Sequence, residues 1–212
     1  MLLLCSLSHA PLPSDARASP HRSDGSWLGF GYNNYGQLGL GDTDSRGVDP
    51  GEMGDNLPII DLGTGRTATA ITAGGGHTCA LLDNNTTKCW GHNSYGQLGQ
   101  GDTDRRGDGA GEMGDFLDAI DLGTSRTATA ITAGDYHTCA LLDNSTVKCW
   151  GWNALGQLGQ GDTANRGDGA GAMADLLLPT HLATRRTATP ITPRNPHTFA
   201  LLHNNTTKST RH

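Results

Sequence analysis

The sequence is poor in several features that mark whole classes of protein. It has no run of 18 or more apolar residues, so it predicts no membrane span. Charged residues make up 17% of the chain and aromatic residues 5%. So low a charge argues against a self-repelling, disordered chain. Lysine and arginine form no basic patch, and the formal net charge is −6. We therefore do not expect nucleic-acid binding, which needs clustered cations.

Motifs for catalysis are absent from the sequence as well. It contains no G-x-S-x-G, no phosphate-binding P-loop, no H-E-x-x-H and no nucleophile beside a base. The sequence therefore predicts a protein that is not an enzyme and that needs no cofactor and no metal.

Glycine is abundant, with 31 of the 212 residues, and it belongs to a tandem repeat. Three motifs each recur with an offset of 60 residues: GQLG at 36–39, 96–99 and 156–159; GDT at 41–43, 101–103 and 161–163; HT(C/F)ALL from His77, His137 and His197. Independent motifs do not share one spacing by chance, so the period is the primary signal of the sequence.

One repeat unit predicts four short strands, at 68–74, 77–82, 86–91 and 119–123. Small and β-branched residues alternate in these segments, and glycine ends most of them. Asn and Asp in the turn after the second strand favour a hairpin. The expected fold class is all-β, with propeller-like blades of four antiparallel strands. About three units are present, fewer than the roughly 4–8 blades that close a propeller, so we expect an incomplete or open one.

The repeats predict a simple domain organisation. Residues 1–26 are expected to be a leader or linker, 27–209 the repeat domain with units of about 30–89, 90–149 and 150–209, and 210–212 a tail. The last unit looks degenerate, since Pro190 and Pro193 replace alanines of the previous copy and proline is excluded from central strands. We expect 185–212 to pack poorly.

The pattern AGxxHTCALL…KCWGxNxxGQLGxGDT resembles the regulator of chromosome condensation repeat, a β-propeller repeat. The resemblance extends over about residues 27–209 and is carried by Gly74, His77, the Trp90-Gly91 pair and the GQLG turn. It implies a propeller fold and suggests nucleotide exchange on a small GTPase. No motif of a GTPase contact surface is present, and the 60-residue period is longer than the family's usual unit.

Two cysteine pairs lie in equivalent hairpins, Cys79 with Cys89 and Cys139 with Cys149. The turn centred on Asn84 places the first pair opposite each other, within reach of a disulfide. The third copy has lost both cysteines, to Phe199 and Ser209, as expected of partners. Free buried thiols are the plain alternative. Zinc binding is disfavoured because each hairpin offers two thiolates, where structural zinc takes four ligands.

Disulfides point to an oxidising compartment, so we expect an extracellular or secretory location, with a cytoplasmic one as the alternative. Asn-x-Ser/Thr sequons agree with this, although the same asparagines suit a turn; they begin at Asn84, Asn85, Asn144, Asn204 and Asn205. The start of the chain fits either a weak signal peptide or an unstructured tail.

The long charged loops at 40–56, 100–116 and 160–175 are the expected recognition surface. Their candidate binding residues are Asp42, Asp44, Arg46, Asp102, Asp104, Arg106, Glu112, Asp115, Asp162 and Arg166. Calcium binding by these carboxylates is an alternative, but alternating charges favour loops that pair with themselves. The tripeptide Arg106-Gly107-Asp108 is not kept in the first copy, so we interpret it as coincidental.

The recurring histidines and tryptophans are interpreted as structural, with each histidine bonded to a neighbouring turn. The sequence as a whole predicts a non-enzymatic scaffold for an unknown protein partner, with self-association or completion by further repeats possible. Two alternatives stay open: an exchange factor for a small GTPase, and a fragment of a larger repeat protein without independent function.

Overall fold

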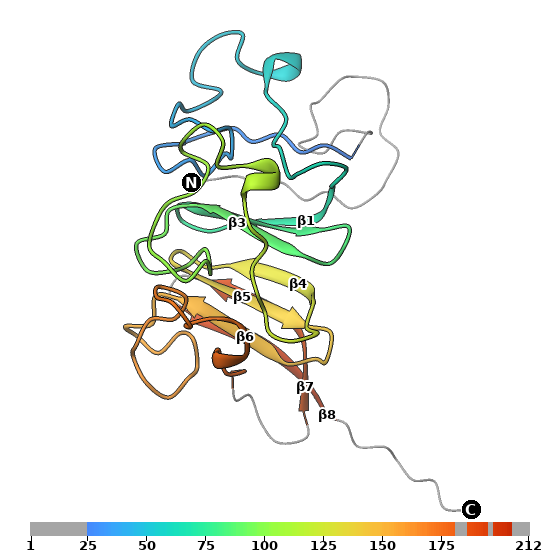
Figure 1. Ribbon diagram of the computed structural model, residues 1–212, viewed down its shortest axis with the longest axis vertical. Coiled ribbons are helices and arrows are strands. Elements are labelled where there is room, and N and C mark those ends of the chain that lie inside the picture. Colours follow the sequence, from blue (N-terminus) through green and yellow to red (C-terminus); the bar gives the residue numbers. More distant parts are fainter. Residues whose placement is uncertain (1–24, 181–185, 195–196, 205–212) are drawn as a thin grey trace, which may run out of the picture.

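The computed structural model describes residues 25–180, 186–194 and 197–204, so most of the expected leader and all of the expected tail lie outside it. Its strands form three antiparallel sheets stacked one upon another along the long axis (Figure 1). The first blade comprises β1 (Ala68–Ala73), β2 (His77–Leu82) and β3 (Thr87–Gly91). The second blade comprises β4 (Ala128–Ala133), β5 (His137–Leu142) and β6 (Val147–Gly151). The C-terminal strand pair is β7 (Arg186–Arg194) with β8 (His197–Asn204).

Short 3-10 turns interrupt the loops between sheets: η1 (Gly54–Asn56), η2 (Gly114–Phe116) and η3 (Ala174–Leu176). None of the helices among the described residues is long or apolar enough to cross a membrane.

The strands of the two blades follow the sequence pattern closely. β2 and β3 are buried along their whole length, because each blade is covered on both faces by a neighbour. Between them, Asn85 adopts the left-handed conformation, with φ 63°. The Asn84 side chain accepts bonds from the backbone and hydroxyl of Thr86. The hairpin chemistry expected from the sequence is therefore present.

The hairpin register produces the expected disulfides. Cys79 is paired with Cys89 across the ladder, and Cys139 with Cys149. Their sulfurs are bonded, and the Cα atoms in each pair lie 4.1 Å apart. The pairing inferred from the sequence is confirmed, and the alternatives of free thiols and zinc fall away for these four residues.

The expected fourth strand of each blade is reduced to a single ladder bond. Residues 119–123 form no assigned strand. The backbone N–H of Ile120 donates to the carbonyl of Thr87 at the edge of β3, and Thr180 repeats this bond to Val147. In the second blade Pro179 cannot donate a backbone bond, and in both blades a 3-10 turn lies just upstream of the segment. Each blade thus has three full strands and one residual one.

The last unit keeps a paired strand hairpin, although its prolines predicted that strands would be lost there. β7 and β8 pair over most of their length, although β7 contains Pro190 and Pro193. β7 is an edge strand, where a missing donor is tolerated, and Pro190 lies where the register shifts between Ala188 and Ile191. Prolines at a bulge of an edge strand do not break the ladder. Residues 205–212 lie outside the described part.

The hydrophobic core is divided into layers between successive sheets. One layer joins Cys79, Leu98 and other residues of the first blade to Ile131 and Trp150 of the second. Another joins Ile60 and Leu62 of the N-terminal segment to the first blade. Each blade is therefore stabilised mainly by its two neighbours, as in a repeat array.

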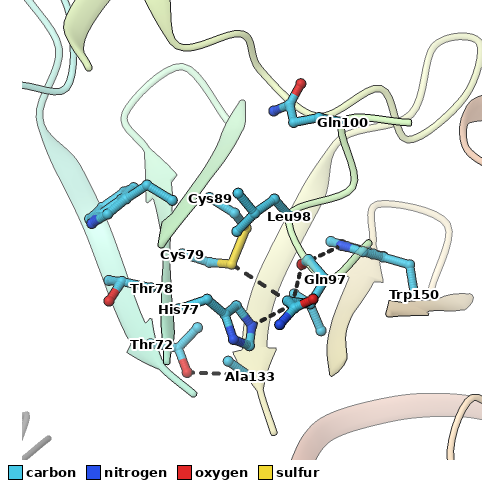
Figure 2. The surroundings of a disulfide bond; sticks show 12 residues. Thr72, His77, Thr78, Cys79, Cys89, Gln97, Leu98, Gln100, Ala133 and Trp150 are labelled. Atoms are coloured by element: carbon cyan, nitrogen blue, oxygen red, sulfur yellow. Dashed lines mark hydrogen bonds between the residues drawn. A yellow bond between two sulfur atoms is a disulfide. The ribbon is translucent and has the colours of Figure 1, made fainter. Parts of the chain in front are cut away.

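The junction between the two blades is built around a buried histidine (Figure 2). His77 Nε2 lies 2.8 Å from Thr138 Oγ1, and that hydroxyl donates to the carbonyl of Gln97. Since the hydroxyl proton is used, Nε2 carries the proton that joins His77 to Thr138. The histidine partner is thus a hydroxyl on a neighbouring strand, not a turn as expected. Gly74 is needed beside the ring because a Cβ there would overlap it.

The layers on both sides of the first blade each bury a tryptophan and a lysine, Trp90 with Lys88 and Trp150 with Lys148. Trp150 is 0% exposed, and its indole N–H donates to the carbonyl of Gln97, as Trp90 does to Gln37. The amine of Lys88 donates to the carbonyls of Leu62 and Gly114. These bonds fasten loops of adjacent repeats to each sheet.

Candidate interaction surface

The charged residues of the long loops bond mainly to their own loops. Asp102 accepts an ion pair from Arg106 at 2.7 Å, and its carbonyl and carboxylate accept bonds from the Asn93 amide. The other two copies contain the same ion pair, Arg46 with Asp42 and Arg166 with Asp162. These predicted binding residues therefore stabilise the conformation of their own loops.

Two further acidic candidates also have partners within the chain. Glu112 accepts backbone N–H bonds from Gly107, Asp108 and Gly109 through one carboxylate oxygen. Asp115 accepts both the backbone and the hydroxyl bond of Thr64, which lies in the preceding repeat. Among the ten candidates, Asp44 and Asp104 are exposed and have no side-chain bond assigned in the described part of the chain. The loops offer fewer free charges than their composition suggests.

The Arg-Gly-Asp tripeptide is part of a contact between repeats. Gly107 accepts a bond from the backbone of Gly41, and Arg106 forms a two-way backbone bridge with Gly91. A Cβ on Gly36 would overlap the backbone of Asp108, so the GQLG turn fits against this loop only as glycine. The tripeptide serves packing, and its backbone is not free to bind as an extended motif.

A feature that the sequence reasoning missed is a continuous row of aromatic side chains across the repeats. We call it the aromatic row, and its members are Tyr32, Tyr35, His92, Tyr95, Tyr136 and Trp152. Neighbouring ring centroids lie 4.8–6.1 Å apart, mostly edge to face. Tyr32 is 48% exposed and Tyr136 is 40% exposed, while the other members are half-buried. The row forms a rigid, partly open aromatic surface.

A repeated sequence signal underlies the row. The residue after the Trp-Gly or Phe-Gly pair is Tyr32, His92 or Trp152, so its identity varies while it stays aromatic. Two residues of the adjoining turns, Tyr35 and Tyr95, repeat as well. Superposing the three copies by their period would have found this pattern, since it is invisible in any single copy.

Polar contacts fix the geometry of the row. The Gln97 carbonyl oxygen of the side chain accepts the backbone N–H of Tyr95, so its amide nitrogen faces His92 Nδ1 at 2.6 Å. Burial first, and the Arg105 charge second, lower the pKa of His92, which keeps the ring neutral at neutral pH. The guanidinium of Arg105 lies 4.9 Å from the centroid of the Tyr35 ring. The row thus has a cation stacked on Tyr35, near its N-terminal end.

A hollow of about 530 Å³ lies at the junction of the first and second blades. Glycines and alanines line most of it, together with Asp118 and Asp121. Within the described ranges, no group of three or more His, Cys, Asp or Glu residues could hold a metal. The hollow offers few side chains that could hold a ligand, so the aromatic row is the better candidate.

The predicted glycosylation sites differ in how far the structure describes them. Asn84, Asn85 and Asn144 are exposed in the hairpin turns, and the first and third use their side-chain oxygens to accept local bonds. Asn204 ends β8, and Asn205 lies outside the described residues. Modification of these asparagines stays a prediction.

Comparison with known proteins agrees with the resemblance of the repeat. Profiles described as the regulator of chromosome condensation (RCC1) repeat match residues 24–81, 68–97 and 128–157. The ultraviolet-B receptor UVR8 of Arabidopsis thaliana is 29% identical over 143 residues, which cover 68% of this chain and 29% of the receptor. The human probable E3 ubiquitin-protein ligase HERC4 is 30% identical over 136 residues, covering 64% of this chain and 11% of the ligase. The chain thus spans less than a third of the length of these relatives.

Solved structures resemble the fold at low sequence identity. Human WBSCR16 matches with a TM-score of 0.59 and 16% identity, over 88% of this chain and 42% of that one. Yeast RCC1 (Prp20), solved with Kap60, matches with a TM-score of 0.59 and 14% identity, over 86% of this chain and 40% of that one. These matches show the fold, an incomplete set of propeller blades.

Proposed function

Because the chain belongs to the RCC1-like repeat family, we propose that it is a non-catalytic scaffold that binds a protein partner through the aromatic row. The observation that carries this proposal is the row itself. Tyrosine and tryptophan are enriched at the energetic centres of protein interfaces, because they bury a large area with little loss of conformational entropy. Rings that are already held in place by neighbouring rings and by Gln97 lose even less conformational entropy on binding.

The row suits a protein better than a small molecule. It crosses the N-terminal segment and both blades, so it offers an extended shallow surface instead of an enclosed pocket. The loops adjoin it at Arg105, which allows charged residues at the rim to add specificity. A similar fold has been solved with a protein partner, since Prp20 was crystallised with Kap60.

Site-specific photo-crosslinking tests the proposal. A benzophenone amino acid replaces Tyr136 in the full chain, and in a control it replaces Phe116, which is 80% exposed outside the row. After incubation with an extract of the source organism and irradiation, position 136 is expected to yield a discrete crosslinked protein that position 116 does not. The same products at both positions, or none at 136, would contradict the proposal.

We further propose that the scaffold works in an extracellular or secretory compartment. The two disulfides support this, because reducing compartments rarely keep structural disulfides. Intact mass before and after reduction and alkylation of the native protein provides the test. Alkylation of the four hairpin cysteines without reductant would favour the cytoplasmic alternative. A mass loss on deglycosylation would show that at least one of the sequons is modified.

A further inference from the structure

We propose that the third long loop, 160–175, contains a binding site for a glutamate side chain of an acidic peptide. The site is formed by the backbone N–H groups of Gly167, Asp168 and Gly169. In the first and second long loops, the three equivalent N–H groups bind a carboxylate of the chain itself. No residue of the aromatic row takes part, so the site is independent of the proposed function.

The first two loops show what this backbone arrangement binds. In the second loop one carboxylate oxygen of Glu112 accepts the N–H groups of three consecutive residues, from Gly107 to Gly109, at 2.9–3.1 Å. In the first loop Glu52 accepts the three equivalent N–H groups at 2.8–3.0 Å. Consecutive N–H groups that converge on one point form an anion-binding concavity, a nest. The bond from the backbone of Asp49 contributes most to lowering the pKa of Glu52, so the nest favours an ionised carboxylate.

The third loop keeps the nest and has lost the glutamate. Ala172 stands 60 positions after Glu112, so the side chain at this position ends at its Cβ. The backbone keeps its form, because φ is 85° at Gly47, 86° at Gly107 and 85° at Gly167. The 3-10 turns η1, η2 and η3 also follow the three nests at the same offset. The loop therefore presents the same three donors without an acceptor on its own side chain.

The place that the carboxylate takes in the second loop is accessible in the third. A Cβ added to Gly109 would lie 3.0 Å from an oxygen of Glu112, whereas one added to Gly169 would meet nothing within 4 Å. Within the described residues, the N–H groups from Gly167 to Gly169 are bonded to no acceptor. Asp168 is exposed and Gly169 is half-buried. A carboxylate from another molecule can therefore reach the three donors.

The accessibility of the nest does not depend on where the sequence ends. The second loop belongs to the internal repeat, which has a neighbour on both sides. Its nest residues Asp108 and Gly109 are nevertheless only half-buried, and so is Glu112. The neighbouring repeats thus leave this side of the loop uncovered, and a further repeat would leave the third nest uncovered in the same way.

The charges beside the nest favour a singly charged ligand. Arg166 is already ion-paired with Asp162 at 2.6 Å, and the carboxylate of Asp168 belongs to the nest itself. The second loop tolerates such a pair of acids: burial first, and the bond to Glu112 second, raise the pKa of Asp108. A phosphate dianion would meet stronger repulsion than a carboxylate. A glutamate side chain is the ligand that the first two loops supply, and backbone nests are known to capture carboxylates of peptides.

An amide NMR titration of the full chain tests the site, with the second loop as an internal control. The probe is an acetylated and amidated peptide that carries one glutamate. We expect the amide signals of Gly167, Asp168 and Gly169 to shift and saturate, and those of 107–109 to stay unchanged because Glu112 occupies their nest. The same peptide with glutamine should bind at least about tenfold more weakly. Equal shifts in both loops, or no saturable shift in the third, would overturn the proposal.

Two substitutions that copy residues of the other repeats separate the nest from a general effect of charge. Ala172→Glu restores the internal ligand and should abolish the saturable shifts. Ala164→Asp adds the same charge to the same loop, where the other two copies have aspartate, and should leave the shifts in place. Conversely, Glu112→Ala should make the amides of 107–109 respond to the peptide. Binding that survives Ala172→Glu, or that Ala164→Asp abolishes equally, would overturn the proposal.

Two further probes identify the source of the anion. One is an amide-free peptide without acidic side chains, whose only carboxylate is its C-terminus, and the other is inorganic phosphate. We expect both to bind the third nest more weakly than the glutamate peptide does. Tighter binding of either probe would overturn the assignment to a glutamate side chain.

Discussion

Trp90 and Phe30 occupy the same position of the repeat, yet Trp90 is fully buried and Phe30 is 39% exposed. The preceding repeat accounts for the difference. Trp90 lies against Gln37 and Gly39, and its indole bonds to the first of them. No described residue takes that place before Phe30. The comparison teaches that a blade's strands are specified within one repeat, whereas its burial depends on the neighbour.

The largest expected effect comes from truncating the internal aromatic residue. Trp90→Ala should lower the free energy of unfolding by about 3–5 kcal/mol, because it leaves a cavity and removes one of the two side-chain bonds to the Gln37 carbonyl. Phe30→Ala should cost about 1 kcal/mol or less in the isolated chain, since much of the ring already contacts water. Urea unfolding of both variants measures the difference. Equal losses would show that the preceding repeat does not determine burial.

A pair of equivalent glycines isolates the contact between repeats. Gly96 and Gly156 both have positive φ, of 76° and 75°, so alanine brings the same backbone strain of about 1 kcal/mol. Only at Gly96 does the new Cβ overlap the next loop, at Asp168. Gly96→Ala should therefore cost about 1–3 kcal/mol more than Gly156→Ala in thermal unfolding. Similar losses of stability in the two variants would contradict the view that the loop of the next repeat packs against Gly96 and that nothing packs against Gly156.

Each of the two complete blades contains a disulfide, whereas residues 27–31 and the β7–β8 pair contain no cysteine. Replacing Cys79 and Cys89 by serine should lower the free energy of unfolding by about 2.5 kcal/mol, the cost of releasing a short closed loop. Hydrogen exchange should show faster exchange in β2 and β3, with residues 28–31 unchanged. Equal loss of protection in β2–β3 and in residues 28–31 would mean that residues 28–31 depend on the Cys79–Cys89 disulfide.

The buried histidines make the internal junctions sensitive to pH. Burial lowers the pKa of His77 to about 3 and that of His137 to about 4, from the ordinary value of 6.5. Below pH 6.5 the unfolded chain binds protons that the folded chain does not, so the contribution to stability is complete above pH 6.5 and falls as the pH approaches about 4 for His137 and about 3 for His77. Each histidine contributes up to about 1.4 kcal/mol per pH unit in that window. His77→Gln should reduce this slope in unfolding measured from pH 7 to pH 4; an unchanged slope would contradict the assignment.

The sequence predicted the parts of the fold that depend on local patterns. The strands around Thr78 and the turn at Asn84 follow from alternation and turn chemistry, and the opposed cysteines follow from the register. The residual fourth strand and the strand containing Pro190 were misjudged, because an edge position and a bulge change what a residue tolerates. Those features depend on the assembled sheet.

The candidate site was less predictable, because its contacts cross between repeats. The charges of the loops suggested recognition, but Asp115 bonds to Thr64, 51 residues away, and Arg106 bonds within its own loop. The aromatic row joins rings such as Tyr35 and His92 from different repeats. Composition shows that such residues are present, and only the fold shows which of them meet.

The central claim is that the aromatic row recognises a protein partner, and an affinity measurement tests it most directly. The partner identified by crosslinking is titrated calorimetrically against the native chain, a Tyr95→Ala/Tyr136→Ala variant, and Phe116→Ala as an exposed aromatic control. Removal of two ring anchors should weaken binding by more than about tenfold, with the control unchanged and all three proteins equally folded. Native affinity in the double variant would contradict the claim.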